Sequence, residues 1–295
     1  MDSITHTLFG VGLYQSIKKE DMSKKERYVL LFTCIGASQI PDIDVVSQLW
    51  DHNGQYQMWH RGITHSIFLA PVWALLFAGI SRIIFGIRGI RPFLISLLAV
   101  FIHITSDLLN AWGTGYLEPF SSVRLTAGTV PIIDFVIWII FALAFVVARL
   151  YPAYKRIRIF RIAWVLIALH VTVQSVQGYV LYEKYQDKYE QVALSARFLP
   201  WHFTVVGKGE HHVDLINDSL FSEAHLVERL DSSDSTDLAP LFAANPKAKT
   251  LYDWSPFVVV EDKGNRIGIY DPRFYRNGAS FLAEYMEKKP GQDQP

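Results

Sequence analysis

Histidine and aspartate residues stand next to long apolar runs in this sequence, in a pattern that suits metal binding. The candidates share an imidazole or carboxylate group and a place at the end of an apolar run: His6, Asp42, Asp44, His60, His65, His103 and Asp107. Because His103 and Asp107 are four residues apart, one face of a helix would present both to a common ion. Imidazole and carboxylate ligands together favour zinc, manganese or iron over calcium and magnesium, which prefer oxygen ligands alone.

The number of candidates bears on the number of ions. Seven candidate ligands exceed the four of a single tetrahedral site, so we predict a centre of two divalent ions. Zinc is the first choice of metal, and Asp107 is the predicted bridging ligand. Our catalytic candidates are Asp107, His65 and Arg61. Metal ions would lower the pKa of a bound water, and Arg61, like Arg124, could hold an anionic group of the substrate.

Several of these residues also have a purely structural interpretation. Asp42 could end a helix, and Thr64 and Ser66 could cap the apolar segment that follows them. Asp134 could be an acid in the first turn of the segment 131–151, where the helix dipole favours it. For Asp134 we favour this structural interpretation. Asp107 is harder to explain in this way, because a carboxylate at the centre of a membrane segment costs roughly 2.5–3.5 kcal/mol and needs a partner.

The elements that must position these residues are apolar segments, and 51% of the chain is apolar. The segments cover about 3–17, 27–40, 65–87, 92–110, 131–151 and 160–181. The last four are about as long as a helix that crosses a bilayer, so we predict four membrane spans. The first two are shorter, and they either cross a thinned region or pack against the bundle.

The distribution of basic residues predicts an orientation. Loops 18–27, 82–91 and 149–161 hold thirteen Lys and Arg residues, whereas the short loops 41–64 and 111–130 hold two, Arg61 and Arg124. Under the positive-inside rule the first three loops are cytoplasmic, and the N-terminus and the C-terminal part lie outside. All the metal candidates then fall at the outer face, although the orientation was derived from Lys and Arg alone.

After about residue 181 the composition changes and short β-type runs appear. The runs WHFTVV and HHVDLI flank GKGE, and PFVVVED and RIGIYD flank KGN, which predicts two hairpins. We therefore expect an all-α polytopic membrane helical bundle, residues 1–181, that carries the metal site, and a small extracytoplasmic α+β domain, residues 182–295. The single cysteine, Cys34, excludes an internal disulfide framework and a cysteine-based zinc site.

The motifs as a set resemble the YdjM-like family of bacterial membrane-bound proteins, described as metal-dependent hydrolases and as LexA-binding inner-membrane proteins. The resemblance covers about residues 1–150 and rests on four motifs: SITH at 3–6, PDID at 41–44, HRGITHS at 60–66 and HITSDLLN at 103–110. It implies a multi-pass protein of the bacterial inner membrane whose His and Asp residues in these motifs form a metal site. It implies no substrate.

A more distant similarity concerns the order of the ligands. An early His, an Asp in a turn, a later His and a helical H-x-x-x-D are similar to the ligand order of zinc-dependent phospholipase C and of single-strand-specific zinc nucleases. This similarity favours phosphoester chemistry. The sequence lacks the second downstream His and carboxylate motif that a full set of three zinc ions would need.

Three classes of function compete at this point. The leading one is a hydrolase that acts on a phosphoester or on a lipid or cell-envelope substrate, with membrane lipid as its surroundings. The alternative is a non-catalytic membrane protein with a structural metal site and a regulatory or interaction role. An ion or proton carrier ranks last, because the ionisable residues cluster at one end of the segments. The zero net charge gives no sign of direct nucleic-acid binding.

Overall fold

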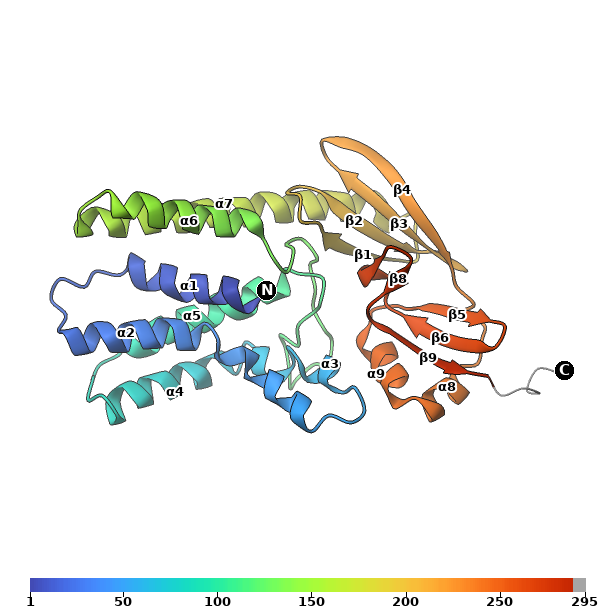
Figure 1. Ribbon diagram of the computed structural model, residues 1–295, viewed down its shortest axis with the longest axis horizontal. Coiled ribbons are helices and arrows are strands. Elements are labelled where there is room, and N and C mark those ends of the chain that lie inside the picture. The colour runs from blue at the N-terminus through green and yellow to red at the C-terminus, as the bar shows by residue number, and fades with distance from the viewer. Residues whose placement is uncertain (289–295) are drawn as a thin grey trace. The chain divides into compact units, whose positions relative to one another are not determined.

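The computed structural model describes residues 1–288, of which about half are helical (Figure 1). The chain divides into two units. The first contains Met1–Asp44 and Arg61–Val176, and the second contains Val45–His60 and residues 177–288. The segment Val45–His60, which the sequence analysis placed within the 1–181 domain, therefore groups with the C-terminal unit.

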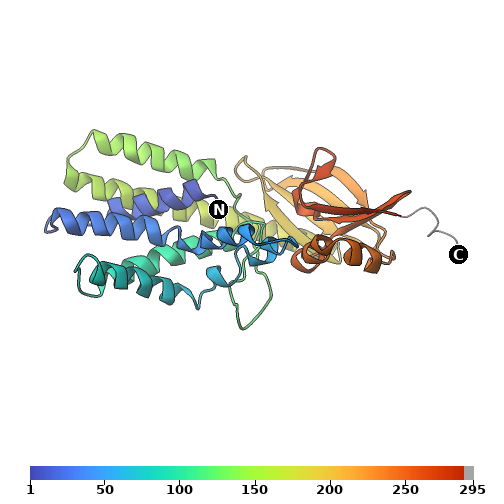
Figure 2. The same cartoon turned by 60° about the horizontal axis from the view of Figure 1, so that its bottom comes forward.

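Helices that run roughly alongside one another build the first unit (Figures 1 and 2). They are α1 (Ser3–Ser16), α2 (Lys24–Ala37), α4 (Ala70–Ile83), α5 (Arg91–Leu108), α6 (Phe135–Arg149) and the first part of α7 (Ala153–Gln186). Asp2 caps α1, Ser23 caps α2, and Asp134 caps α6 by accepting hydrogen bonds from the N–H groups of Val136 and Ile137. The sequence predicted an acid within the first turn, and the structure places Asp134 one position earlier, as the N-cap, so its structural role at the start of α6 is confirmed.

Close backbone contact sets the distance between α1 and α2. A Cβ atom added at Gly10 would lie 2.8 Å from the carbonyl oxygen of Cys34, so only glycine fits this position without a shift of backbone. The same pair of helices packs around a buried cluster that includes Leu13, Leu30 and Cys34. This approach brings the N-terminal end of α1, which carries His6, towards the C-terminal end of α2.

Only some of the predicted membrane spans form single helices that are long enough to cross a bilayer. Within the described residues, two helices are long and apolar enough to cross a bilayer, Arg91–Leu108 and Lys155–Gln186. Two bent pairs of helices raise the number to four if each pair is counted as one span. Helix α6 has 15 residues and extends about 22 Å, which is shorter than a bilayer core of about 30 Å. The expected span over 131–151 is shortened by the cap at Asp134.

The segment around HRGITHS is less helical than expected. Helix α4 begins at Ala70, with Pro71 in its first turn, and residues Ile63–His65 form a short 3-10 helix, η2, ahead of it. No side chain caps α4. The proposed capping role of Thr64 and Ser66 is therefore wrong, and both hydroxyls bond elsewhere. The PDID motif lies at the start of another 3-10 helix, η1 (Ile40–Leu49).

The second unit is built on antiparallel sheets. Strands β1 (Gln191–Ala196), β2 (Phe203–Lys208), β3 (His212–Ser219) and β4 (Ser222–Asp231) form one sheet in that order. A second sheet has the order β5 (Val259–Lys263), β6 (Arg266–Tyr270) and β9 (Ala283–Glu287). Both predicted hairpins are confirmed, as β2–β3 and β5–β6.

Short elements complete the second unit. They are helices α3 (Tyr56–Trp59), α8 (Ala239–Ala244) and α9 (Pro246–Trp254), the 3-10 helix η3 (Pro272–Phe274) and a small ladder of β7 (Tyr275–Arg276) with β8 (Ala279–Ser280). Buried residues of both sheets, among them Val206, Leu215 and Val259, form a common core. The unit therefore mixes helices and antiparallel strands, as the sequence indicated.

Candidate metal centre

Four side chains of the first unit converge on one point in its interior. Asp42 lies on η1, His65 on η2, and His103 and Asp107 on successive turns of α5. One ligand atom from each lies within 4.8 Å of the others. The side chains of His65, His103 and Asp107 are fully buried, whereas that of Asp42 is 19% exposed. The sequence placed these four residues among its candidates, and the fold brings them together.

The distances among these atoms match a tetrahedron around a small cation. Nε2 of His65 lies 3.1 Å from Nε2 of His103, 3.4 Å from Oδ1 of Asp42 and 3.2 Å from Oδ2 of Asp107. Nε2 of His103 lies 3.6 Å from the same Asp42 oxygen and 3.5 Å from the same Asp107 oxygen. Ligands about 2.0–2.1 Å from a zinc ion in a regular tetrahedron are about 3.3–3.4 Å apart. A first-row transition metal would fit between them.

The hydrogen bond at the far side of the His103 ring fixes its tautomer. Nδ1 of His103 lies 2.7 Å from the carbonyl oxygen of Ser38, and a carbonyl can only accept, so Nδ1 carries the proton. In the neutral ring Nε2 is then an acceptor with its lone pair directed at the other three ligand atoms. A backbone carbonyl that accepts from the far nitrogen of a ligand histidine and orients the ring in this way is typical of metal sites.

His65 is held in an equivalent way by a side chain. Its Nδ1 lies 3.0 Å from Oγ1 of Thr64 and 3.5 Å from Oδ2 of Asp44. The Thr64 hydroxyl in turn lies 2.8 Å from that Asp44 oxygen, to which it donates. An Asp–His pair of this kind raises the basicity of the opposite ring nitrogen. Asp44 therefore supports His65 from behind and lies outside the group of four converging atoms.

Two imidazole lone pairs and two carboxylate oxygens thus face one another in a buried space. Acceptors at such distances repel one another unless a proton or a cation lies between them. Among the described residues, neither oxygen of Asp107 accepts a hydrogen bond of regular geometry, and its cationic contacts are ion pairs with the Met1 amino group and the Arg61 guanidinium. The chemistry of this donor set and its spacing both suit a divalent metal ion, which would place positive charge between the four ligand atoms.

His6 approaches Asp107 from the opposite side. Its Nε2 lies 3.4 Å from Oδ1 of Asp107, and its ring stacks on that of His103 with centroids 3.7 Å apart. Neither ring nitrogen of His6 has a hydrogen-bond partner in the part of the chain that the structure describes, although the ring is fully buried. The amino group of Met1 also contacts the Oδ1 side of Asp107. The two oxygens of Asp107 therefore face two different sets of groups.

Arg61 lies beside the same carboxylate. Its Nε is 3.3 Å from Oδ2 of Asp107, and its Nη1 donates to Oδ1 of Asn110 at 2.8 Å. The backbone of Arg61 has φ of 58°, a left-handed conformation that is uncommon outside glycine. This conformation lets its N–H donate to Asp44 at 2.9 Å while its carbonyl accepts from the N–H of Gly115 at 2.7 Å. Arg61 thus supports the site in two ways. Its strained backbone places the N–H and the carbonyl for these hydrogen bonds, and its buried charge lies beside Asp107.

Two sequence candidates, His60 and Arg124, are not among the four converging ligands. His60 belongs to the second unit, where its ring stacks on that of Tyr56. Arg124 donates through Nη2 to the carbonyl of Gly113 at 3.1 Å. Three groups of the site were not predicted from the sequence. The Ser38 carbonyl and the Asn110 amide had no expected role, and Thr64 was expected to cap a helix. The sequence could have indicated Asn110 and Thr64, because each belongs to a motif that also contains a candidate ligand.

A second polar pair lies away from these residues. Nε2 of His170, on α7, is 2.9 Å from Oδ2 of Asp134, whose other oxygen caps α6. Nothing in the sequence marks these two residues as partners. The pair joins α6 to α7, and it needs no ion because a histidine N–H can donate to the carboxylate.

Comparisons with known proteins agree with this geometry. The family described as YdjM inner membrane protein matches residues 1–181, which include every ligand of the centre. An uncharacterised protein of Bacillus subtilis, YfhP, is 30% identical over 138 residues, which are 45% of this chain and 42% of that protein. The match thus spans less than half of the relative's length. No solved structure matches the chain. Because the family match covers more than half of the sequence, the chain belongs to the YdjM inner membrane protein family.

Proposed function

We propose that this protein is a metal-dependent hydrolase of the bacterial inner membrane that cleaves a phosphoester. In this proposal two divalent ions share the carboxylate of Asp107. Asp42, His65 and His103 complete one position, and His6 belongs to the other. Family membership supports the membrane location, and the buried His and Asp cluster supports metal binding.

The orientation of Asp107 is the observation that carries the proposal. One of its oxygens faces His65 and His103, and the other faces His6. Within the described residues, neither nitrogen of the buried His6 ring makes a regular hydrogen bond, and a second ion beside Oδ1 of Asp107 would give Nε2 of His6 a partner. A bridging carboxylate between two ions is a frequent arrangement in enzymes that hydrolyse phosphoesters.

The residues of the site have separable roles in such a reaction. Bound metal ions would supply a water of lowered pKa and a positive field for the developing oxyanion. The Ser38 carbonyl and Asp44 hold the two imidazoles in the ligand tautomer, and Arg61 offsets part of the negative charge of the carboxylates. Asp42, the partly exposed ligand, marks the side from which a substrate would approach.

The orientation in the membrane remains part of the proposal. The excess of Lys and Arg in loops 18–27, 82–91 and 149–161 favours a multi-pass arrangement with the metal site and the C-terminal unit outside the cytoplasm. A cysteine introduced at Ser235 in a Cys34→Ser background should react with an impermeant maleimide in intact cells. Reaction only after the membrane is opened would place the C-terminal unit in the cytoplasm and refute this orientation.

Metal analysis and a substrate panel test the function directly. Protein purified in detergent should contain about two transition-metal ions per chain, and His6→Gln should reduce this to about one while leaving the first position filled. Hydrolysis of bis(p-nitrophenyl) phosphate should require both ions. His170→Gln, which alters a buried histidine of the same unit outside the cluster, is the matched control and should retain metal and activity.

One observation favours a second function. Four protein ligands already complete a tetrahedron, and structural metal sites are typically closed in this way. A non-catalytic membrane protein with one structural ion would therefore show one ion per chain, no effect of His6→Gln on metal content, and a loss of folded protein when the ion is removed by chelation. The stoichiometry distinguishes the two functions before any substrate is known.

A further inference from the structure

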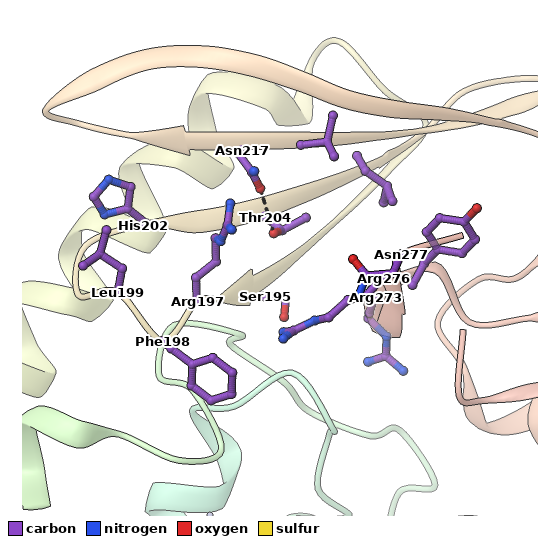
Figure 3. A pocket seen from close by; sticks show the side chains of 13 residues that line it. Ser195, Arg197, Phe198, Leu199, His202, Thr204, Asn217, Arg273, Arg276 and Asn277 are labelled. Atoms are coloured by element: carbon purple, nitrogen blue, oxygen red, sulfur yellow. Dashed lines mark hydrogen bonds between the residues drawn. The ribbon is translucent and has the colours of Figure 1, made fainter. Parts of the chain in front are cut away.

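The second unit contains a cavity of about 670 Å³ between its four-stranded sheet and the segment 273–277 (Figure 3). This volume is within the range of small-molecule sites. The lining residues come from β1, β2, β3, β4, the β1–β2 turn, η3 and the β7 hairpin, and they include Arg197, Phe198, Thr204, Asn217, Arg273 and Arg276. The set contains three arginines and no carboxylate.

The arginines differ in how they are engaged. Arg273 is buried and makes an ion pair with Asp271, so its charge is already matched. Within the described residues, Arg197 and Arg276 have no ion pair with a carboxylate, and Arg276 lies over the ring of Phe198 at 5.6 Å. Figure 3 shows Arg197 on the sheet side and Arg276 on the hairpin side of the cavity. Two unmatched guanidinium groups on opposite walls favour an anion between them.

The floor of the cavity is polar and formed by the sheet. Ser195, Thr204 and Asn217 are direct neighbours across β1, β2 and β3, and the Thr204 hydroxyl donates to Oδ1 of Asn217 at 3.1 Å. Hydroxyl and amide groups in a row can bond the oxygens of an ester or an alcohol. The floor therefore suits an anion that carries further oxygen atoms, such as a phosphodiester, better than a bare ion.

The rim of the cavity is apolar and exposed. Phe198 and Leu199 in the β1–β2 turn belong to the lining and are 51% and 61% exposed. Phe221 in the β3–β4 turn is outside the lining and is 72% exposed. Trp201 joins these two turns through an edge contact with Phe221, their ring centroids being 5.9 Å apart. An exposed aromatic cluster on hairpin tips is typical of contact with the interfacial region of a bilayer.

Strand β1 runs back along α7 towards its apolar part. Leu194 packs with Tyr185, whereas Ala196, two residues further along β1, packs with Leu181, four residues earlier in α7. Residues 162–182 of α7 contain no Asp, Glu, Lys or Arg, so the apolar part ends next to Leu181. The β1–β2 turn extends beyond Ala196 in the same direction. The apolar residues of the β1–β2 turn therefore lie level with the C-terminal end of the apolar part of α7, a helix that is long enough to span a bilayer.

From these observations we infer that the cavity binds the phosphate headgroup of an anionic membrane phospholipid, with Arg197 and Arg276 on the phosphate and the Phe198 rim against the acyl chains. The proposal uses none of the residues of the metal centre and stands independently of the hydrolase function. Phosphate could also reach the cavity on a soluble molecule, so the test must separate the two sources.

Native mass spectrometry of the full chain in mild detergent measures this binding. The probes are phosphatidylglycerol, phosphatidylcholine with the same acyl chains, and glycerol 3-phosphate. We expect phosphatidylglycerol to bind about tenfold more tightly than phosphatidylcholine, and Arg197→Gln or Arg276→Gln to weaken it about tenfold, which corresponds to a lost charge-assisted bond. Phe198→Ser should weaken the lipid and leave glycerol 3-phosphate unaffected.

Two controls make the result decisive. Arg266→Gln removes an exposed arginine of the same unit that lies outside the cavity lining, and it should leave binding unchanged. Asp107→Asn should leave lipid binding unchanged even where metal is lost, so that failure of the hydrolase proposal is recognised separately. Equal affinity for both lipids, equal loss in Arg266→Gln, or glycerol 3-phosphate binding as tight as phosphatidylglycerol would overturn the assignment.

Discussion

Asp107 in the first unit and Asp271 in the second are both fully buried carboxylates, yet their surroundings are opposite. Asp271 is surrounded by donors: the Arg273 guanidinium, the Arg273 N–H at 2.9 Å and the Ser255 hydroxyl at 2.8 Å. Asp107 also has cationic neighbours, the Met1 amino group and the Arg61 guanidinium, but in addition it faces the acceptor nitrogens of His65 and His103. The hydrogen bonds and the ion pair of Asp271 come from the protein itself. The acceptor atoms around Asp107 leave a place for a cation.

This difference indicates which of the two carboxylates is suited to binding an ion. A buried carboxylate with a matched arginine contributes to the fold, and no further ligand is needed. A buried carboxylate among imidazole lone pairs leaves a place for a cation, because the protein supplies acceptors and a limited positive charge from Arg61. The comparison predicts that the same Asp→Asn change will affect metal content in one unit and stability in the other.

The largest effect is expected for Asp107→Asn. The substitution preserves size but removes the charge that two sets of ligands share, so metal affinity should fall by more than about 100-fold, beyond the effect of a lost supporting contact. Metal content of the purified protein, measured by inductively coupled plasma mass spectrometry, checks this. The variant should still insert and remain monodisperse, and His170→Gln should keep its metal. Full occupancy in Asp107→Asn would show that the ligands are assigned wrongly.

Asp271→Asn should have the converse effect. It leaves the buried guanidinium of Arg273 without its counter-charge, which typically costs about 3–5 kcal/mol, while metal content stays at the wild-type level. Denaturation followed by circular dichroism of the sheets measures the loss. Asp253→Asn, which removes an exposed partner of Lys249, is the matched control and should change stability by less than about 1 kcal/mol. Equal effects of the two variants would contradict the buried ion pair.

A smaller effect is expected at Asp44, which supports His65 without belonging to the four converging atoms. Asp44→Asn should weaken metal binding by about 10–100-fold, the usual result of losing a carboxylate behind a ligand histidine. Competition with a chromogenic chelator gives the affinity. The exposed Asp21→Asn is the control for a change of net charge. If Asp44→Asn abolished binding as completely as Asp107→Asn does, Asp44 would be a ligand itself.

The smallest effect concerns acid stability in the second unit. A bidentate bond from Arg229 holds the pKa of Asp214 below its usual value, while burial and its bond to Asp214 raise the pKa of Tyr189 to about 12. The stabilisation by Asp214 is therefore present at neutral pH and is lost as the pH falls below about 4. It should amount to about 1 kcal/mol because Arg229 is half exposed.

A pH titration of sheet circular dichroism checks this expectation. The acid limb should become less steep in Asp214→Asn and in Arg229→Gln, because either change removes the difference in proton affinity between the folded and unfolded chain. An unchanged acid limb in both variants would show that other carboxylates control acid unfolding.

Local spacing predicted a large share of the fold and of the site. The four-residue separation of His103 and Asp107 placed both on one face of α5, because that relation depends only on helical periodicity. The cap at Asp134 and the two hairpins also follow from short-range rules, since turn and cap residues act within a few positions. These features required no knowledge of how distant segments pack.

Long-range contacts could not be predicted in the same way. His170 and Asp134 are 36 residues apart, and nothing in either segment marks them as partners. The extent of helix α4 was overestimated because apolar composition does not show that the chain at Ile63–His65 turns as a 3-10 helix. The left-handed backbone of Arg61 depends on contacts with Asp44 and Gly115 that only the folded unit provides.

The acceptor that orients His103 is a backbone carbonyl, and this has a consequence for how the protein tolerates mutation. Every amino acid offers a carbonyl, so the identity of residue 38 does not enter this hydrogen bond, provided that the side chain is small enough for a buried position. A deep mutational scan should therefore find position 38 permissive to Ala and Gly. His65, whose orientation depends on the Asp44 carboxylate, has no such tolerance at its supporting position.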